Sequence, residues 1–153
     1  MILKKTAKAV DIAVYITSRA TVKPVTTEEI ATGLGLSCSY TESILKELRE
    51  AGLIRAHRGP GGGYCLARNA LEISVADVIL AVDEPLDATQ CGGRENCKSD
   101  HRCMTHDLWA TLNRKMLDYL ASVSLSDLVE KQRQKASAQA AKQTVSFSAA
   151  QAA

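Results

Sequence analysis

Apolar side chains repeat at intervals of three and four residues in several stretches of this chain, with polar residues between them. The first stretch covers residues 3–19 and predicts an amphipathic helix that ends before a loop containing Pro24. The residues expected on its inward face are Leu3, Ala7, Val10 and Val14, with Ala13 and Ile16 on a neighbouring row.

Two short helices are expected next, each opened by a capping box. In this motif a Ser or Thr side chain and a Glu three residues later bond to each other's backbone amides. Thr26 and Glu29 match the first box, and Ser39 and Glu42 match the second. Gly52 is placed to end the second of these helices. Two short helices joined by a glycine-containing turn predict a helix-turn-helix.

A β-hairpin is expected directly after the helix-turn-helix. Residues 53–58 and 64–67 partly alternate between apolar and polar, and the glycine-rich run between them excludes a helix. A hairpin in this position is the wing of a winged-helix domain. At its tip Gly59 and Gly61 have no side chain, so backbone amides there can approach DNA phosphates. The pattern predicts a mainly α fold, a winged helix-turn-helix with a small hairpin wing, that binds DNA.

The second half of the chain contains a polar loop between helical segments. A fourth helix is expected over Ser74–Val82, with Pro85 ending it, and residues 86–102 have too few apolar side chains to bury a surface of their own. A last short helix is expected over Ser124–Gln134. The Ala-, Ser- and Gln-rich residues 136–153 suggest a mobile tail.

A long helix beginning near Thr105 has large apolar residues at spacings of three and four, which is a coiled-coil pattern. Its seam consists of Trp109, Leu112, Met116, Tyr119 and Val123. A short stripe of this kind also suits packing within one chain. Because helix-turn-helix proteins usually bind palindromic DNA as two-fold dimers, we expect a homodimer through this seam.

Charge and composition refine this interpretation. Residues 1–70 contain ten Lys and Arg against six Asp and Glu, whereas residues 71–153 contain nine against eleven, so the basic half coincides with the expected DNA-binding domain. No secretory signal or spanning segment is evident, which favours a cytoplasmic protein without a membrane partner. In a reducing compartment five cysteines are unsuited to a disulfide framework. Cys38 and Cys65 are interpreted as small apolar fillers.

The remaining cysteines form a candidate metal or iron-sulfur site. Cys91, Cys97, Cys103 and His106 have the spacing C-x5-C-x5-C-x2-H, and thiolate and imidazole groups are the side chains that bind zinc and iron-sulfur clusters. Structural zinc sites generally pair ligands two to four residues apart, so these longer gaps favour a larger cluster over zinc.

Three segments of this sequence carry a family resemblance: RGPGGGY at 58–64, DATQC at 87–91 and CMTHDLW at 103–109. Together they resemble the IscR family, winged-helix transcription factors that regulate iron-sulfur cluster assembly. The similarity extends from the first helix to about Gln134. It divides the chain into a DNA-binding domain (1–82), a cluster-binding loop (83–104), a dimerisation helix with a short final helix (105–135) and the tail (136–153).

The resemblance implies that Cys91, Cys97, Cys103 and His106 ligate a 2Fe-2S cluster supplied by the iron-sulfur assembly machinery. It implies a homodimer that binds double-stranded DNA at palindromic operators. The holo form is expected to repress cluster assembly genes, its own operon included, and the apo form to repress or activate other sites. An imidazole is a weaker anchor for iron than a thiolate and is lost on protonation, which suits a labile sensing cluster.

The same resemblance places Ser39, Glu42 and Arg58 at base edges. Two groups of further contacts are expected from chemistry alone. Tyr40 is either a core residue or a phosphate donor, and Lys4, Lys5 and Lys8 are candidates for phosphate binding near the first helix. A fixed anion at residue 42 is expected to reject unsuitable base edges and to accept from cytosine. Ser39 and Glu42 also match a capping box, and this conflict between cap and base edge is a candidate switch.

Two alternatives follow from the same residues. The related nitric-oxide-sensing regulators use three cysteines with a carboxylate from the first helix, where this chain has Lys8 and, nearby, Asp11. An iron-sulfur carrier or electron-transfer module would use the cluster as its function and the winged helix for docking. An enzyme is not expected, because no nucleophile, base and orienting group occur together at a recognisable spacing.

Overall fold

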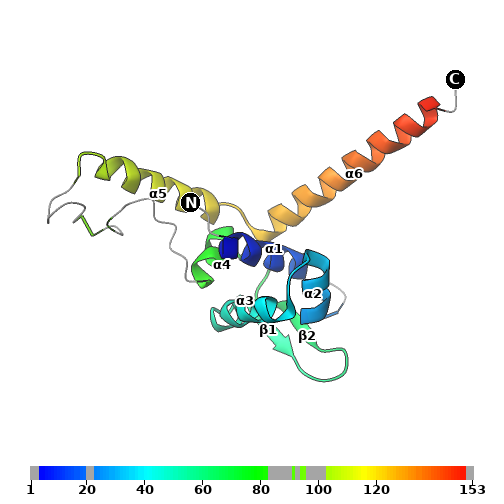
Figure 1. Cartoon of the computed structure of the whole chain (residues 1–153), viewed down its shortest axis with the longest axis horizontal. Helices are drawn as coiled ribbons and strands as arrows, with labels where there is room; N and C mark the ends of the chain where they lie inside the picture. The colour runs from blue at the N-terminus through cyan, green and yellow to red at the C-terminus, as the bar shows by residue number, and fades with distance from the viewer. Residues whose placement is uncertain (1–3, 20–22, 83–90, 92–93, 96–102, 151–153) are drawn as a thin grey trace.

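A helix-turn-helix followed by a two-stranded hairpin lies at one side of the molecule, at the bottom of the view in Figure 1. The computed structural model describes residues 4–19, 23–82, 91, 94–95 and 103–150. In chain order the elements are α1 (Lys4–Arg19), α2 (Thr27–Leu34), α3 (Cys38–Glu50), β1 (Ile54–His57), β2 (Gly63–Leu66), α4 (Val75–Ala81), α5 (His106–Ala121) and α6 (Leu125–Ala150). This architecture confirms the predicted mainly α, winged helix-turn-helix fold.

Each helix of the helix-turn-helix has an N-terminal cap. The cap of α2 agrees with the prediction and the cap of α3 differs from it. Thr26 and Glu29 form the expected capping box of α2, which ends at Gly35 in the left-handed conformation. In α3, however, the N-cap is Ser37, whose side chain accepts from the Tyr40 amide at 3.3 Å. The predicted box of Ser39 and Glu42 is therefore wrong, since the helix begins before Ser39.

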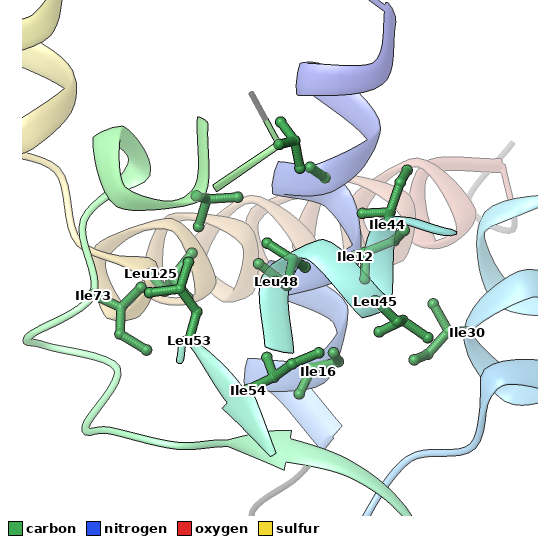
Figure 2. Packing of buried hydrophobic residues seen from close by; sticks show 14 of the residues in the cluster. Ile12, Ile16, Ile30, Ile44, Leu45, Leu48, Leu53, Ile54, Ile73 and Leu125 are labelled. Atoms are coloured by element: carbon green, nitrogen blue, oxygen red, sulfur yellow. The ribbon is translucent and has the colours of Figure 1, made fainter. Parts of the chain in front are cut away.

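The hydrophobic core lies between α1, α3 and the start of the wing, as Figure 2 shows for its labelled side chains. Ile12 and Ile16 of α1 are fully buried, and so are Ile44, Leu45 and Leu48 of α3. The inward face of α1 differs from the prediction, because Ala7 is exposed and Val10 and Val14 are only half-buried. The buried row consists of Thr6, Ala9, Ile12, Ala13 and Ile16. The small residues of this row allow α1 to pack closely against its neighbours.

The wing is tied to the helix-turn-helix by backbone hydrogen bonds. Strands β1 and β2 pair in antiparallel register from Ile54 opposite Leu66 to His57 opposite Gly63. Val25, just before α2, forms a bridge with Tyr64 through bonds of 2.7 and 2.9 Å. A Cβ added to Gly63, which has a φ of 147°, would lie 2.5 Å from the Val25 carbonyl oxygen. Glycine at residue 63 therefore permits this close approach.

Helices α4 and α6 begin side by side. Ser74 and Ser124 form an isolated antiparallel bridge, and each residue precedes a helix that it caps together with an Asp three residues later. Leu125 and Val129 of α6 are buried, while Leu128 is half-buried. Helix α6 then projects away from the body and reaches Ala150 (Figure 1). The structure thus differs from the prediction of a tail without regular structure after residue 135, and the high helix propensity of alanine accounts for the continuation.

Candidate DNA interface and metal ligands

The first turns of α3 present a set of exposed polar side chains. Ser39, Tyr40 and Glu42 are all exposed, so the alternative of Tyr40 as a core residue is wrong. Because Ser37 forms the cap, the Ser39 hydroxyl and the Glu42 carboxylate take no part in it. Within the part of the chain that the structure describes, neither group has a hydrogen-bond partner, and both are available to a ligand.

The wing tip lies beside the N-terminus of α2. A hollow of about 420 Å³ separates them, and its lining includes Thr26, His57, Gly59 and Gly61. Arg58 is exposed at the base of the tip and Gly59 and Gly61 both have positive φ values, 99° and 75°. Backbone amides of a glycine tip and of a helix N-terminus are both suited to phosphate oxygens.

The cap of α2 also fixes a negative charge next to this hollow. The Thr26 amide donates to the Glu29 carboxylate at 2.9 Å, and the Lys23 ammonium lies 3.1 Å from the same group. The backbone hydrogen bond from Thr26, followed by the bond from Lys23, lowers the pKa of Glu29. Glu29 therefore stays ionised while it stabilises the start of α2.

Two of the lysines expected to contact phosphates differ in their surroundings. Lys4 is exposed at the start of α1. The Lys5 ammonium instead lies 2.8 Å from the carboxylate of Glu47 in α3 and 3.4 Å from the carbonyl oxygen of Val82. Sequence reasoning missed Glu47. No local pattern in the sequence indicates this contact, because the two residues lie 42 positions apart on different helices.

Two of the predicted metal ligands converge. The Cys91 Sγ atom lies 3.6 Å from Nδ1 of His106, which is 3% exposed at the first residue of α5. Cys103 is half-buried, with its Sγ atom 3.7 Å from the Thr105 hydroxyl. Cys97 lies outside the described residues. Among the described residues no group of three or more His, Cys, Asp or Glu side chains has the geometry of a metal site.

The Cys91 and His106 pair has a separation that fits two ligands of one metal ion. With metal-sulfur and metal-nitrogen bonds of about 2.3 and 2.0 to 2.1 Å, tetrahedral coordination separates the two donor atoms by roughly 3.6 Å. Thiolate and imidazole donors also fit an iron-sulfur cluster. Cys91 and His106 therefore fit the iron-sulfur cluster that the family resemblance implies.

The two remaining cysteines are not simple core residues. Cys38 is exposed, so its interpretation as an apolar filler is wrong. Cys65 is half-buried on β2, and its Sγ atom lies 3.2 Å from both Nε of Arg55 and Nε2 of His57 on the neighbouring strand. The pairing of Arg55 opposite Cys65 in the hairpin register brings these groups together.

The seam of α5 remains largely uncovered in the single chain. Trp109 and Leu112 are each 40% exposed and Tyr119 is 65% exposed, whereas Met116 is half-buried. The predicted seam residue Val123 does not belong to this helix, because α5 ends at Ala121. Helix α5 contacts α4 within the chain. The three exposed residues are not explained by that packing, so the alternative of a purely intramolecular stripe does not account for the seam.

These features define a winged-helix protein with an exposed recognition helix and a cysteine-histidine pair at the start of a long helix. Residues 2–131 match the Rrf2 family, described as iron-dependent transcriptional regulators, and the chain belongs to this family. The HTH-type transcriptional regulator IscR of Photorhabdus laumondii is 49% identical over 109 residues. That alignment covers 71% of this chain and 66% of the relative, so the chain matches slightly less than two thirds of the relative's length.

Solved structures give the same fold assignment. CymR of B. subtilis, the global cysteine regulator, has a TM-score of 0.74 at 25% identity, with coverage of 86% of this chain and 97% of CymR. IscR of T. potens has a TM-score of 0.72 at 28% identity, with coverage of 86% and 87%. The family and the named relatives are transcriptional regulators, in agreement with the expectation that this chain is not an enzyme. None of the described helices combines the length and hydrophobicity required to cross a membrane.

Proposed function

We propose that this protein is a DNA-binding transcriptional regulator whose activity depends on a 2Fe-2S cluster. The observation that carries the proposal is the convergence of Cys91 and His106 at 3.6 Å in a chain of a family described as iron-dependent regulators. In the sequence, both residues are far from the recognition helix, α3. Their pairing at the start of α5 connects the candidate ligand set to the helix proposed for dimerisation.

The proposed ligands are Cys91, Cys97, Cys103 and His106. A bound cluster would link the polar loop to the start of α5. Its presence or absence would indicate the supply of iron and sulfide. The imidazole of His106 is held in a buried position at the helix N-terminus, which limits its access to water. The cluster is proposed to come from the iron-sulfur assembly machinery.

The proposed DNA interface consists of the exposed face of α3 and the wing. Ser39 and Glu42 would contact base edges, Tyr40 a phosphate, and Arg58 the minor groove or a phosphate. The amides at Gly59 and Gly61 and the ammonium of Lys4 would bind phosphates. Through the α5 seam two copies would place these surfaces on the two halves of a palindromic operator.

The proposed regulation is a feedback loop. The cluster-bound protein represses genes for cluster assembly, its own operon among them, and the apo-protein acts at a different class of site. Cluster supply then controls cluster synthesis. The nitric-oxide-sensing alternative requires an acid on the first helix, and there the carboxylate of Asp11 lies 3.1 Å from the Lys8 ammonium on an exposed surface.

Anaerobic purification with measurement of the visible spectrum, iron and sulfide tests the cofactor. We expect a coloured protein with equal iron and acid-labile sulfide. His106→Ala should lose most of this cluster, whereas Cys38→Ala, a matched control outside the ligand set, should retain it. A colourless protein containing zinc would overturn the cluster assignment. DNA binding is tested separately, with palindromic duplexes at several salt concentrations, and a protein without salt-sensitive preference for any duplex is not such a regulator.

A further inference from the structure

Lys5 joins three helices at the side of α3 that faces the protein body. Its ammonium is 2.8 Å from both carboxylate oxygens of Glu47 and 3.4 Å from the carbonyl oxygen of Val82, the C-cap of α4. The side chains of Lys5 and Glu47 are 29% and 28% exposed. Lys5 therefore bonds within the protein, at a site less exposed than that of a typical surface ion pair.

The contact between Lys5 and Glu47 matters for DNA binding because of where Glu47 lies on α3. Glu42 and Glu47 lie on different faces of the helix, since Glu42 is exposed and Glu47 is half-buried. An ion pair at Glu47 restrains how α3 rotates and slides against α1, and such movements displace Ser39 and Glu42 in a DNA groove. The pairs Lys8–Asp11 and Lys46–Glu50 each join residues of one helix and cannot do this.

The bond to Val82 extends the restraint to the end of α4. A carbonyl at a helix C-terminus favours a nearby cation, because the partial negative charge of the helix is concentrated there. Val82 is also the last described residue before the segment that leads to Cys91. One ammonium thus bonds both to the recognition helix and to the element that precedes the proposed ligands.

We propose that Lys5 is a positioning residue that sets the placement of α3 on DNA and thereby the choice of base sequence, in place of the phosphate contact expected from the sequence. This inference rests on the proposed DNA-binding function. A phosphate contact would require the ammonium to leave the Glu47 carboxylate. Lys4 next to it is exposed and needs no such exchange.

The test uses the full chain, purified anaerobically, with the best palindromic duplex selected by the wild-type protein from a randomised library. Affinities are measured over a range of salt for that duplex and for its single-base-pair substitutions. The variants are Lys5→Met, Glu47→Gln, their double mutant and Lys5→Arg. Asp11→Asn is the control, because it breaks an ion pair that lies within α1 alone.

Lys5→Met and Glu47→Gln should each reduce the discrimination between the selected and substituted duplexes by roughly 3- to 10-fold. The dependence of affinity on salt should stay at its wild-type slope. The double mutant should resemble the single mutants, since both remove one interaction. Lys5→Arg should restore most of the discrimination, because a guanidinium also pairs with a carboxylate in a bidentate manner.

A salt slope lowered by about one with unchanged discrimination would make Lys5 a phosphate contact and overturn the proposal. A lower melting temperature with unchanged discrimination would mean that the Lys5–Glu47 pair only stabilises the fold, and would overturn the proposal as well. If the wild-type protein itself selects no duplex, the proposed function fails and the inference fails with it. That result is distinct from any outcome of the variants.

Discussion

At the scale of single residues, two serines at the start of α3 have different structural roles. Ser37 accepts the Tyr40 amide and caps the helix, whereas Ser39 lies inside the first turn with an exposed hydroxyl. A switch in which Ser39 exchanges a helix cap for a base edge is therefore not available to this protein. DNA contacts by Ser39 and Glu42 do not require any loss of helix stability.

Alanine substitutions at the two serines should separate stability from recognition. Ser37→Ala should lower the free energy of unfolding by about 1 kcal/mol, since it removes the N-cap. Ser39→Ala should leave stability nearly unchanged and weaken binding to the selected operator. Chemical denaturation and gel-shift titration of both variants measure these effects. Equal destabilisation by the two substitutions would contradict the assignment of the cap to Ser37.

Glu42 is expected to contribute specificity more than affinity. Its exposed carboxylate, in the first turns of α3, would repel phosphate and favour a cytosine amino group. Glu42→Ala should therefore broaden site choice and strengthen binding to duplexes that the wild-type protein rejects. Binding to a panel of operator variants provides the measurement, with Glu50→Ala at the far end of α3 as a control. Unchanged binding to every duplex would exclude this role.

At the scale of secondary-structure elements, the sequence predicted what depends on local chemistry. The capping box at Thr26 and the glycine tip of the wing both agree with the structure. The start of α3 was placed too late because both Ser37 and Ser39 have side chains that can cap a helix, and the hydrogen bond from the Tyr40 amide to Ser37 is evident only in the structure. Cross-element contacts, such as Lys5 with Glu47, have no local signal.

The cap of α6 should make stability depend on pH. The Ser124 amide and hydroxyl donate to Asp127 at 2.9 and 2.7 Å, and the backbone bond, followed by the hydroxyl bond, lowers the pKa of this carboxyl. A carboxyl with a lowered pKa in the folded state stabilises the fold at pH values above its ordinary pKa. This contribution is lost as the pH falls through the lower folded-state pKa.

Asp127→Ala should therefore lower the melting temperature at neutral pH, and the difference from wild type should shrink as the pH falls below about 4. Asp118→Ala on α5 is the control. It also removes an exposed carboxylate, but one that caps no helix. Melting curves between neutral and acidic pH give the comparison. A difference between wild type and Asp127→Ala that stays constant down to acidic pH would show that the cap is not the source of this dependence.

At the scale of the whole molecule, the far end of α6 and the exposed side of α5 lie outside the hydrophobic core, although the first turns of α6 pack into it. Helix α6 projects from the body, and the α5 seam exposes Trp109, Leu112 and Tyr119. The heptad spacing of this seam was evident in the sequence, but its partner was not, because packing within a chain and between chains gives the same pattern. We expect a second chain as the partner, since α4 leaves these side chains exposed.

A charge in the middle of the seam should separate the two chains. Leu112→Glu places a carboxylate where two apolar surfaces would meet, and burying an unpaired charge costs more than the roughly 1.5 to 3 kcal/mol gained by burying a leucine. We expect this variant to sediment as a monomer and to bind an operator half-site more weakly than the wild-type dimer binds the full palindrome. Leu71→Glu, which adds the same charge at a residue that is 67% exposed outside α5, should remain dimeric. Wild-type protein that sediments as a monomer, or a Leu112→Glu variant as dimeric as wild type, would exclude dimerisation through α5.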